Sequence, residues 1–182
     1  MASCDGAWSK GAAVNPVVER SGADIIVVAD ADCVCEGLPQ AVGAVERGAG
    51  WGIPHRTVFR LTDEGSVGFM ATGEFGHPFD RRPYKGMAGG GFVVARREVL
   101  LSVPFDARFL NWGQEDESLA LALTTMVGPP WRGDADLVHL WHPPARKLSR
   151  RKGSPESWEL YQEYRRAFGD RDRMAGLLKE AW

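Results

Sequence analysis

The chain has 182 residues and a formal net charge of −2, with 44% hydrophobic and 25% charged residues. This length is sufficient for one domain with a sizeable core, and the composition is that of an ordinary globular protein. The near-neutral charge gives no electrostatic reason to expect nucleic acid as a partner. No apolar run approaches the length of a membrane span, and the start of the chain lacks a signal-peptide pattern, so we expect no membrane span and a cytoplasmic location.

The three cysteines are too few to indicate a disulfide framework. Cys33 and Cys35 are separated by one residue, which is tighter than the spacing of ordinary zinc sites. We therefore expect reduced thiols. Cys33 directly follows a pair of carboxylates and is placed to respond to them.

The first half of the chain predicts a helix, a strand and a second helix. Asn15 is the expected N-cap of a helix that begins at Pro16 and runs to Arg20. The apolar run Ile25–Ala29 is typical of a strand buried on both faces in an open parallel sheet. A helix over Leu38–Arg47, short strands over 51–54 and 57–61, and a long loop over 65–85 are expected to follow.

The second half predicts a glycine-rich turn and a run of helices. The elements expected are a turn over 86–91, a strand over 92–95, a short helix over 96–102, an apolar helix over 119–126 preceded by three acidic residues, a strand over 137–142, and C-terminal helices over 155–168 and 170–181. Three consecutive glycines before a strand would let backbone approach a ligand closely, although a simple turn explains them equally well.

Two carboxylates, Asp30 and Asp32, follow the first strand. Ligands of open parallel sheets bind at the carboxyl ends of strands, and two neighbouring carboxylates repel each other unless a cation lies between them. A hard divalent cation that carries a phosphate would resolve this repulsion. The alternative is a strand that stops in a polar turn, and a short motif by itself does not decide between the two.

Other polar groups also have two interpretations. Glu115, Asp116 and Glu117 lie at the expected start of a helix, where they would stabilise its dipole without further function. His139 and His142 are three apart on an expected strand, so they should point to opposite faces and only one should join a given site. The basic run over 146–152 indicates either a solvated loop or phosphate ligands.

Taken together, four segments resemble the GT-A glycosyltransferases, and in particular the inverting β-galactosyltransferases and the polypeptide N-acetylgalactosaminyltransferases. They are Lys10–Asn15, which looks like the segment before the acidic strand; Asp30–Asp32, which looks like the DxD motif; Gly89–Asp116, which looks like the GG…FD…WGxED block; and Val138–His142, which looks like the late segment that carries a metal-binding histidine. The WGQED letters with a preceding glycine-rich strand are the most specific of these matches. The resemblance covers Lys10 to His142.

The resemblance implies roles for particular residues. Those implied for the metal are Asp32, His139 and Asp30; for catalysis, Asp116 as base and Glu115 as the residue that orients the acceptor; for the donor, Lys10, Asn15, Asp30, Gly89, Gly90, Gly91, Trp112 and His142; and for the acceptor, Trp112, Gly113 and Glu115. The adjacent carboxylates of Glu115 and Asp116 would also raise one pKa toward a value useful for a base.

The implied function is transfer of a sugar from a nucleotide-diphosphate sugar, with a UDP-sugar as the first choice, to a hydroxyl of a glycan or protein, with inversion. The implied cofactor is Mn²⁺ or Mg²⁺, which stabilises the departing diphosphate. A nucleotidyltransferase is the alternative enzyme, since it also places metal-binding carboxylates at strand ends. A non-catalytic module, or one half of a split enzyme, built on the same scaffold is the alternative outside catalysis.

The expected fold is α/β, a GT-A-like or Rossmann-like mixed and mainly parallel sheet flanked by helices, with a core over 1–153 and a helical extension over 154–182. Family members place a strand and helix before the segment that matches Lys10, and the printed sequence has no room for this unit. We therefore expect an exposed flank beside the strand Ile25–Ala29. Self-association, a partner chain or the C-terminal helices would cover it.

Overall fold

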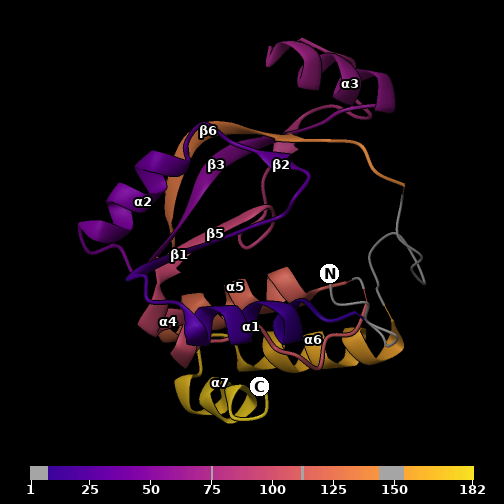
Figure 1. Cartoon of the computed structure of the whole chain (residues 1–182). Coiled ribbons are helices and arrows are strands. Elements are labelled where there is room, and N and C mark those ends of the chain that lie inside the picture. The colour runs from indigo at the N-terminus through magenta and orange to yellow at the C-terminus, as the bar shows by residue number, and fades with distance from the viewer. Residues whose placement is uncertain (1–7, 75, 112, 144–153) are drawn as a thin grey trace.

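The computed structural model describes residues 8–74, 76–111, 113–143 and 154–182, which form a mixed sheet with helices on both faces (Figure 1). The helices and strands are, in chain order, α1 (Lys10–Arg20), β1 (Ile25–Ala29), β2 (Cys33–Val34), α2 (Leu38–Glu46), β3 (Trp51–Arg60), α3 (Asp63–Thr72), β4 (Tyr84–Lys85), β5 (Phe92–Arg96), α4 (Arg97–Ser102), α5 (Glu115–Met126), β6 (Trp131–His139), α6 (Pro155–Ala167) and α7 (Arg171–Leu178). No helix in the described ranges combines the length and the apolar character needed to cross a membrane.

The sheet has the strand order β1-β5-β3-β6-β2, with β4 paired to β3. Between the described strands, β3 and β6 are parallel, and the pairs β1–β5, β3–β5, β2–β6 and β3–β4 are antiparallel. The mixed α/β expectation is thus confirmed, and the expectation of a mainly parallel sheet is wrong. Strand direction depends on which distant segments pair, and the apolar pattern of a single strand does not contain this information.

Strand β1 forms where the apolar run predicted it, at one edge of the sheet, with β5 as its neighbour. Its expected burial on both faces is wrong, because Val27 is 38% exposed. Ile26 and Val28 pack toward the main core, and Ile25 packs toward α2 on the other face. Because β1 is an edge strand and α2 covers only part of this face, the side chain of Val27 is exposed to solvent.

The core lies mainly on one side of the sheet. Val93 and Ala95 of β5 join a large apolar cluster with residues of α1, α5, α6 and α7, whereas Val94, which alternates with them, packs against Ala41 and Val45 of α2. This alternation follows from the two-residue period of a strand. The C-terminal helices α6 and α7 pack against α5 and each other (Figure 1), and not along the edge of β1 as one of the expectations had it.

Helix α1 begins at Lys10, earlier than predicted, because Ser9 caps it by accepting a hydrogen bond from the backbone N–H of Ala12 at 3.3 Å. The prediction of Asn15 as the cap is wrong, and Pro16 lies inside the helix. The buried Asn15 side chain donates to the carbonyl of Phe105 at 2.8 Å and accepts from its N–H at 3.2 Å. Asn15 therefore ties α1 to the loop after α4.

Helix α3 covers the first part of the segment 65–85, so the prediction of a loop over this whole segment is wrong. Thr62 caps it by accepting from the N–H of Gly65, Asp63 and Glu64 stabilise its first turn, and Gly73 ends it with φ of +71°. The sequence predicted a loop here because the many glycines and aromatic residues of this segment show no helical period. The two strands expected over 51–54 and 57–61 are one strand, β3, with register shifts around His55, next to Pro54, which lacks a backbone donor.

The remaining elements lie close to their predicted positions. Helix α2 is followed by Gly48 at φ of +107°, and Ser154 caps α6 with a proline in its first turn. The glycine-rich turn leads into β5, the three acidic residues begin α5, and α7 lies within its predicted range. Strand β6 starts earlier than predicted, at Trp131, and ends at His139.

Candidate active site and metal centre

Asp30 stands just after β1 and is held by the glycine-rich turn. Its N–H donates to the carbonyl of Gly91 at 2.9 Å, and its Oδ2 accepts from the N–H of Gly91 at 3.3 Å. These bonds continue the β1–β5 pairing past the end of β1. The carboxylate is thereby fixed at the end of the strand, where the sequence placed it.

Lys10 joins Asp30 to Asp116, which are far apart in the chain. The Lys10 ammonium lies 2.8 Å from Asp30 Oδ1 and 2.7 Å from Asp116 Oδ1, and its side chain is only 11% exposed. Lys10 is the first residue of α1 and Asp116 lies in the first turn of α5, so the two helix starts meet here. We call these three residues the lysine–carboxylate triad.

The triad is electrostatically coupled. Burial raises the pKa of Asp116 to about 7; Lys10 opposes this shift, while Glu115 and Asp30 add to it. Burial lowers the pKa of Lys10, but Asp116 and Asp30 together outweigh this and raise it, so the ammonium stays charged. Asp116 is therefore a carboxyl group that can exchange a proton near neutral pH.

Asp32 lies next to two imidazoles. Its Oδ2 is 3.3 Å from His142 Nε2 and 3.8 Å from His139 Nε2, and the two rings have centroids 5.3 Å apart. The prediction that the two histidines point to opposite faces is wrong, because both rings lie beside the same Asp32 oxygen; β6 ends at His139, so His142 lies beyond the strand. His142 thus lies with Asp32, whereas its role in donor binding remains a prediction.

In both histidines Nε2 is the ring nitrogen that lies near Asp32, and Nδ1 contacts a backbone carbonyl. His139 Nδ1 lies 2.8 Å from the carbonyl of Leu140, and His142 Nδ1 lies 2.9 Å from that of Pro143. A carbonyl only accepts, so each Nδ1 carries a proton and donates it. Burial, and then Arg60, lower the pKa of His139, which favours an unprotonated Nε2.

This arrangement fits a metal ion by the chemistry of its donor set. An unprotonated Nε2 and a carboxylate oxygen both present lone pairs, so a cation placed between them removes their repulsion. Histidines that bind metals usually donate their other N–H to a carbonyl or carboxylate, as His139 and His142 do here. A carboxylate with two imidazoles suits Mn²⁺, Zn²⁺ and similar divalent ions.

The glycine-rich turn over 86–91 lies close to the lysine–carboxylate triad and to the residues around Asp32. Gly89 has φ of +88°, and a Cβ there would lie 2.3 Å from the carbonyl oxygen of Asp116; Gly91 has φ of +79°, and a Cβ there would lie 2.5 Å from Leu137. The fold therefore requires glycine at these two positions, whatever the ligand. A Cβ on Gly90 would meet only the end of Met87, at 3.4 Å, so its small size is not explained by packing.

Three described residues just before α5 have positive φ. Asn111 and Gln114 are non-glycine residues at φ of 63° and 67°, and Gly113 has φ of 135°. Glu115 Oε2 accepts from the N–H of Gly113 at 2.9 Å, so this side chain supports the turn that leads to Asp116. Trp112, predicted to bind donor and acceptor, and the basic run over 146–152 lie outside the described residues.

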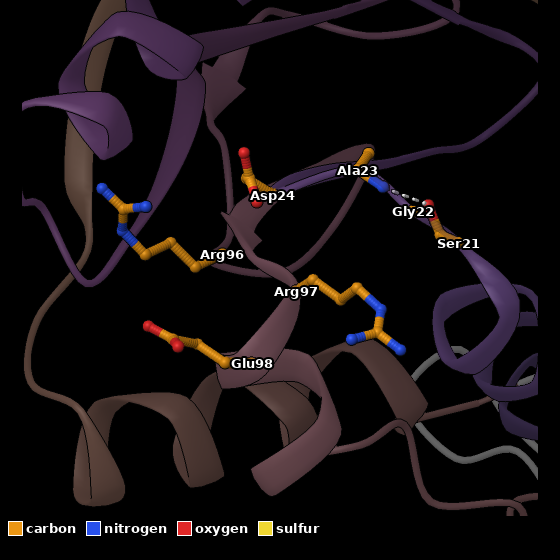
Figure 2. A pocket seen from close by; sticks show the side chains of 7 residues that line it. All are labelled: Ser21, Gly22, Ala23, Asp24, Arg96, Arg97 and Glu98. Carbon is orange, nitrogen blue, oxygen red and sulfur yellow. Dashed lines mark hydrogen bonds between the residues drawn. The ribbon is translucent and has the colours of Figure 1, made fainter.

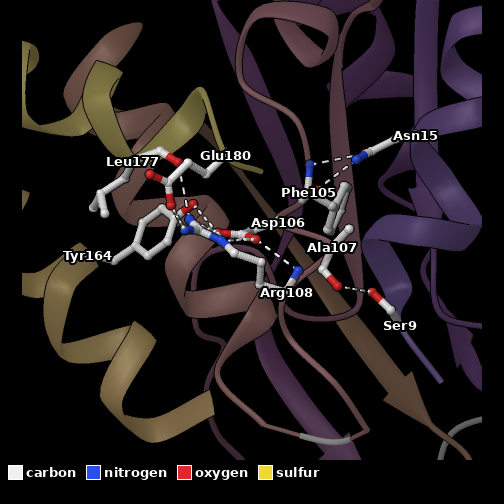
Figure 3. Close-up of polar contacts among 9 residues, drawn as sticks. All are labelled: Ser9, Asn15, Phe105, Asp106, Ala107, Arg108, Tyr164, Leu177 and Glu180. Atoms are coloured by element: carbon white, nitrogen blue, oxygen red, sulfur yellow. Dashed lines mark hydrogen bonds and ion pairs between the residues drawn. The ribbon is translucent and has the colours of Figure 1, made fainter. Parts of the chain in front are cut away.

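The FD part of the family-like block has a structural role. Buried Asp106 accepts from Arg108 Nη2 at 2.6 Å and Nε at 3.0 Å and from the Tyr164 hydroxyl at 2.8 Å (Figure 3). Arg108 also donates to Glu180 Oε2 at 2.6 Å and to the carbonyl of Leu177 at 3.1 Å. This network, the Asp106 cluster, connects the loop before α5 with α6 and α7.

A separate pocket lies at the other end of β1, lined by residues 21–24 and 96–98 (Figure 2). Arg97 donates to the carbonyls of Val18 and Glu19 at 2.9 and 2.6 Å, and Arg96 donates to that of Glu46 at 3.3 Å. The two guanidinium groups thus bind the ends of α1 and α2, a capping role that requires no ligand.

No protein-family model matches the chain, and no curated protein matches it. Function is therefore inferred from the geometry of these residues and from their resemblance to the family motifs.

Proposed function

We propose that the chain is a divalent-metal-dependent glycosyltransferase that moves a sugar from a nucleotide-diphosphate sugar to a hydroxyl acceptor with inversion. One observation carries the proposal: acidic residues and histidines from three distant segments lie at one end of the sheet, where β1 and β6 both finish. Asp30 and Asp32 follow β1, Asp116 lies in the first turn of α5, and His139 ends β6. Lys10 pairs with both Asp30 and Asp116 and so joins the first two of these segments.

In this proposal Asp32, His139 and His142 hold the metal ion. The bound ion supplies positive charge that stabilises the departing nucleoside diphosphate. Asp116 accepts the proton of the acceptor hydroxyl as the hydroxyl oxygen bonds to the anomeric carbon. The bond from that carbon to the diphosphate oxygen breaks, and the diphosphate takes the electron pair.

The environment of Asp116 supports its role as the base. A general base works best when its pKa lies near the working pH, and burial brings that of Asp116 to about 7. Lys10 fixes the Asp116 carboxylate beside Asp30, and Glu115 supports the preceding turn. A Cβ at Gly90 would meet only the flexible end of Met87, at 3.4 Å, so packing does not explain the glycine, and in this proposal its small size lets the donor approach the backbone.

The test is incubation of the full chain with Mn²⁺, a panel of nucleotide sugars and hydroxyl acceptors, with measurement of nucleoside diphosphate release. We expect release that depends on metal. Release of a sugar phosphate instead, as the nucleotidyl group moves to the acceptor, would favour the nucleotidyltransferase, and binding of a nucleotide sugar without release would favour a non-catalytic module.

Two substitutions sharpen the test. Asp116→Asn should lower transfer by about 100-fold or more while nucleotide binding, measured by calorimetry, is retained, because a base acts on the acceptor and not on the diphosphate. Asp134→Asn is the matched control. Asp134 lies on the first half of β6, its side chain is 79% exposed, and it pairs with Arg56 of β3, so it belongs to neither the triad nor the residues around Asp32. Equal loss of binding and transfer in Asp116→Asn would assign this residue a structural role.

A further inference from the structure

The residue after Asp32 is a cysteine that faces the same metal centre. Cys33 is paired directly with His139 in the antiparallel ladder of β2 and β6, and residues directly opposed in such a ladder place their side chains on the same face. The Cys33 sulfur lies 3.6 Å from Asp32 Oδ1. One ligand atom from each of Asp32, Cys33 and His139 lies within 4.8 Å of the other two.

The separations between these atoms are close to those within a tetrahedral metal site. With usual zinc bond lengths of about 2.3 Å to sulfur and about 2.0–2.2 Å to nitrogen and oxygen, neighbouring ligand atoms stand about 3.4–3.6 Å apart. The Cys33 sulfur lies 3.6 Å from Asp32 Oδ1, whereas His142 Nε2 and His139 Nε2 lie 3.3 and 3.8 Å from Asp32 Oδ2. One ion could therefore be held by ligand atoms of Asp32, Cys33 and His139, and His142 lies beside Asp32 as a fourth donor.

We propose that Cys33 is a sulfur ligand of the metal centre, so that the site binds Zn²⁺ and Co²⁺ in preference to Mg²⁺. Thiolate ligands select softer ions, whereas Mg²⁺ requires oxygen ligands in octahedral geometry. The thiol releases its proton to solvent when the sulfur binds the ion. This inference rests on the metal centre of the proposed function and specifies the class of ion that it holds.

Packing offers a competing explanation, because Cys33 also contacts the apolar cluster of Val58, Phe92 and Leu137. A cysteine kept only for packing would contribute nothing to metal binding. Cys35 is the matched control, since it packs against the same cluster and is also free and partly buried, but is not part of the Asp32–Cys33–His139 group. Replacing the two cysteines separately distinguishes a ligand from a core residue.

The experiment is Co²⁺ titration of the full chain carrying Cys4→Ser, monitored by absorption. Sulfur coordination gives a charge-transfer band in the near ultraviolet, which we expect in this protein and after Cys35→Ser, but not after Cys33→Ser. Zn²⁺ should displace Co²⁺, Mg²⁺ should not, and Cys33→Ser should weaken Zn²⁺ binding by at least about tenfold. X-ray absorption of the zinc-loaded wild-type chain should find one sulfur at about 2.3 Å, a measurement that does not require the variant to fold.

The inference is overturned if cobalt binds without the band, if the band persists in Cys33→Ser, or if no cobalt binds. These results are distinguishable from failure of the proposed function. A Cys33-dependent band without nucleoside diphosphate release would contradict glycosyl transfer alone. Metal-dependent release without the band would contradict sulfur coordination alone.

Discussion

Replacing Lys10 by methionine tests whether the lysine–carboxylate triad is needed to hold two carboxylates together. Both carboxylate oxygens lie within 2.8 Å of one nitrogen, so they are at most about 5.6 Å apart. At an effective dielectric constant of about 20, two unit charges at this distance repel by about 3 kcal/mol. Asp30 is 34% exposed, so solvent screening reduces the expected loss of stability to about 1–3 kcal/mol.

The loss of stability caused by Lys10→Met should depend on pH, and the direction of this dependence follows from the pKa of Asp116. Its pKa in the folded state is about 7 against an ordinary value of 3.8, so ionisation of Asp116 disfavours the folded state and stability falls as pH rises through about 7. Removing Lys10 removes the group that opposes this shift, so the pKa of Asp116 rises further. Lys10→Met should therefore be more destabilising at pH 8 than at pH 6, where Asp116 can bind a proton.

Thermal unfolding followed by circular dichroism at the two pH values measures this effect. For a domain of this size, each kcal/mol lowers Tm by about 2–4 °C, which gives a decrease of roughly 2–12 °C at pH 8. Lys179→Met is the control, because Lys179 is exposed and follows α7. An unchanged Tm, or the same decrease at both pH values, would refute the reasoning about the triad.

Three further predictions concern packing and assembly. Tyr164→Phe removes a hydrogen bond to the buried carboxylate of Asp106 and should cost about 1.5–3 kcal/mol of unfolding free energy, measured by urea titration; a change below about 0.5 kcal/mol would contradict this. Gly89→Ala should lower Tm strongly, because its Cβ would collide with the Asp116 carbonyl at positive φ, whereas Gly22→Ala, which meets open space, should not. The free edge of β1 should pair with another copy, so light scattering should give a mass that rises with concentration, and a constant monomer mass would exclude this.

Strong local patterns made much of the fold predictable. The run Ile25–Ala29 and the apolar residues after Glu115 each allow one element type, and both elements form in place. Burial of β1 and the direction of its neighbours were not predictable, because they depend on distant strands. Helix α3 was missed because the cap at Thr62 is a weak signal beside several glycines and aromatic residues.

The candidate site was predictable in its residue types but not in its connections. The motif letters identified Asp30, Asp32 and Asp116, and the structure adds that Lys10 holds the first and third together. The proximity of both histidines to Asp32 was missed because it depends on the point where β6 ends. The signal for Cys33 was present in its position after Asp32, but its pairing with His139 is a long-range property of the sheet.

The Asp106 cluster also has a consequence for biosynthesis. The carbonyl of Ala107, next to Asp106, accepts from the Ser9 hydroxyl at 2.9 Å (Figure 3). The Ala107 N–H donates to the carbonyl of Ala181 at 2.8 Å, so a segment before α1 and a segment after α7 both hold this residue. Contacts between such distant segments are slow to form, and a growing chain makes this one only after Ala181 has left the ribosome. The hydrogen bonds that hold the loop before α5 are therefore completed only after synthesis of α7.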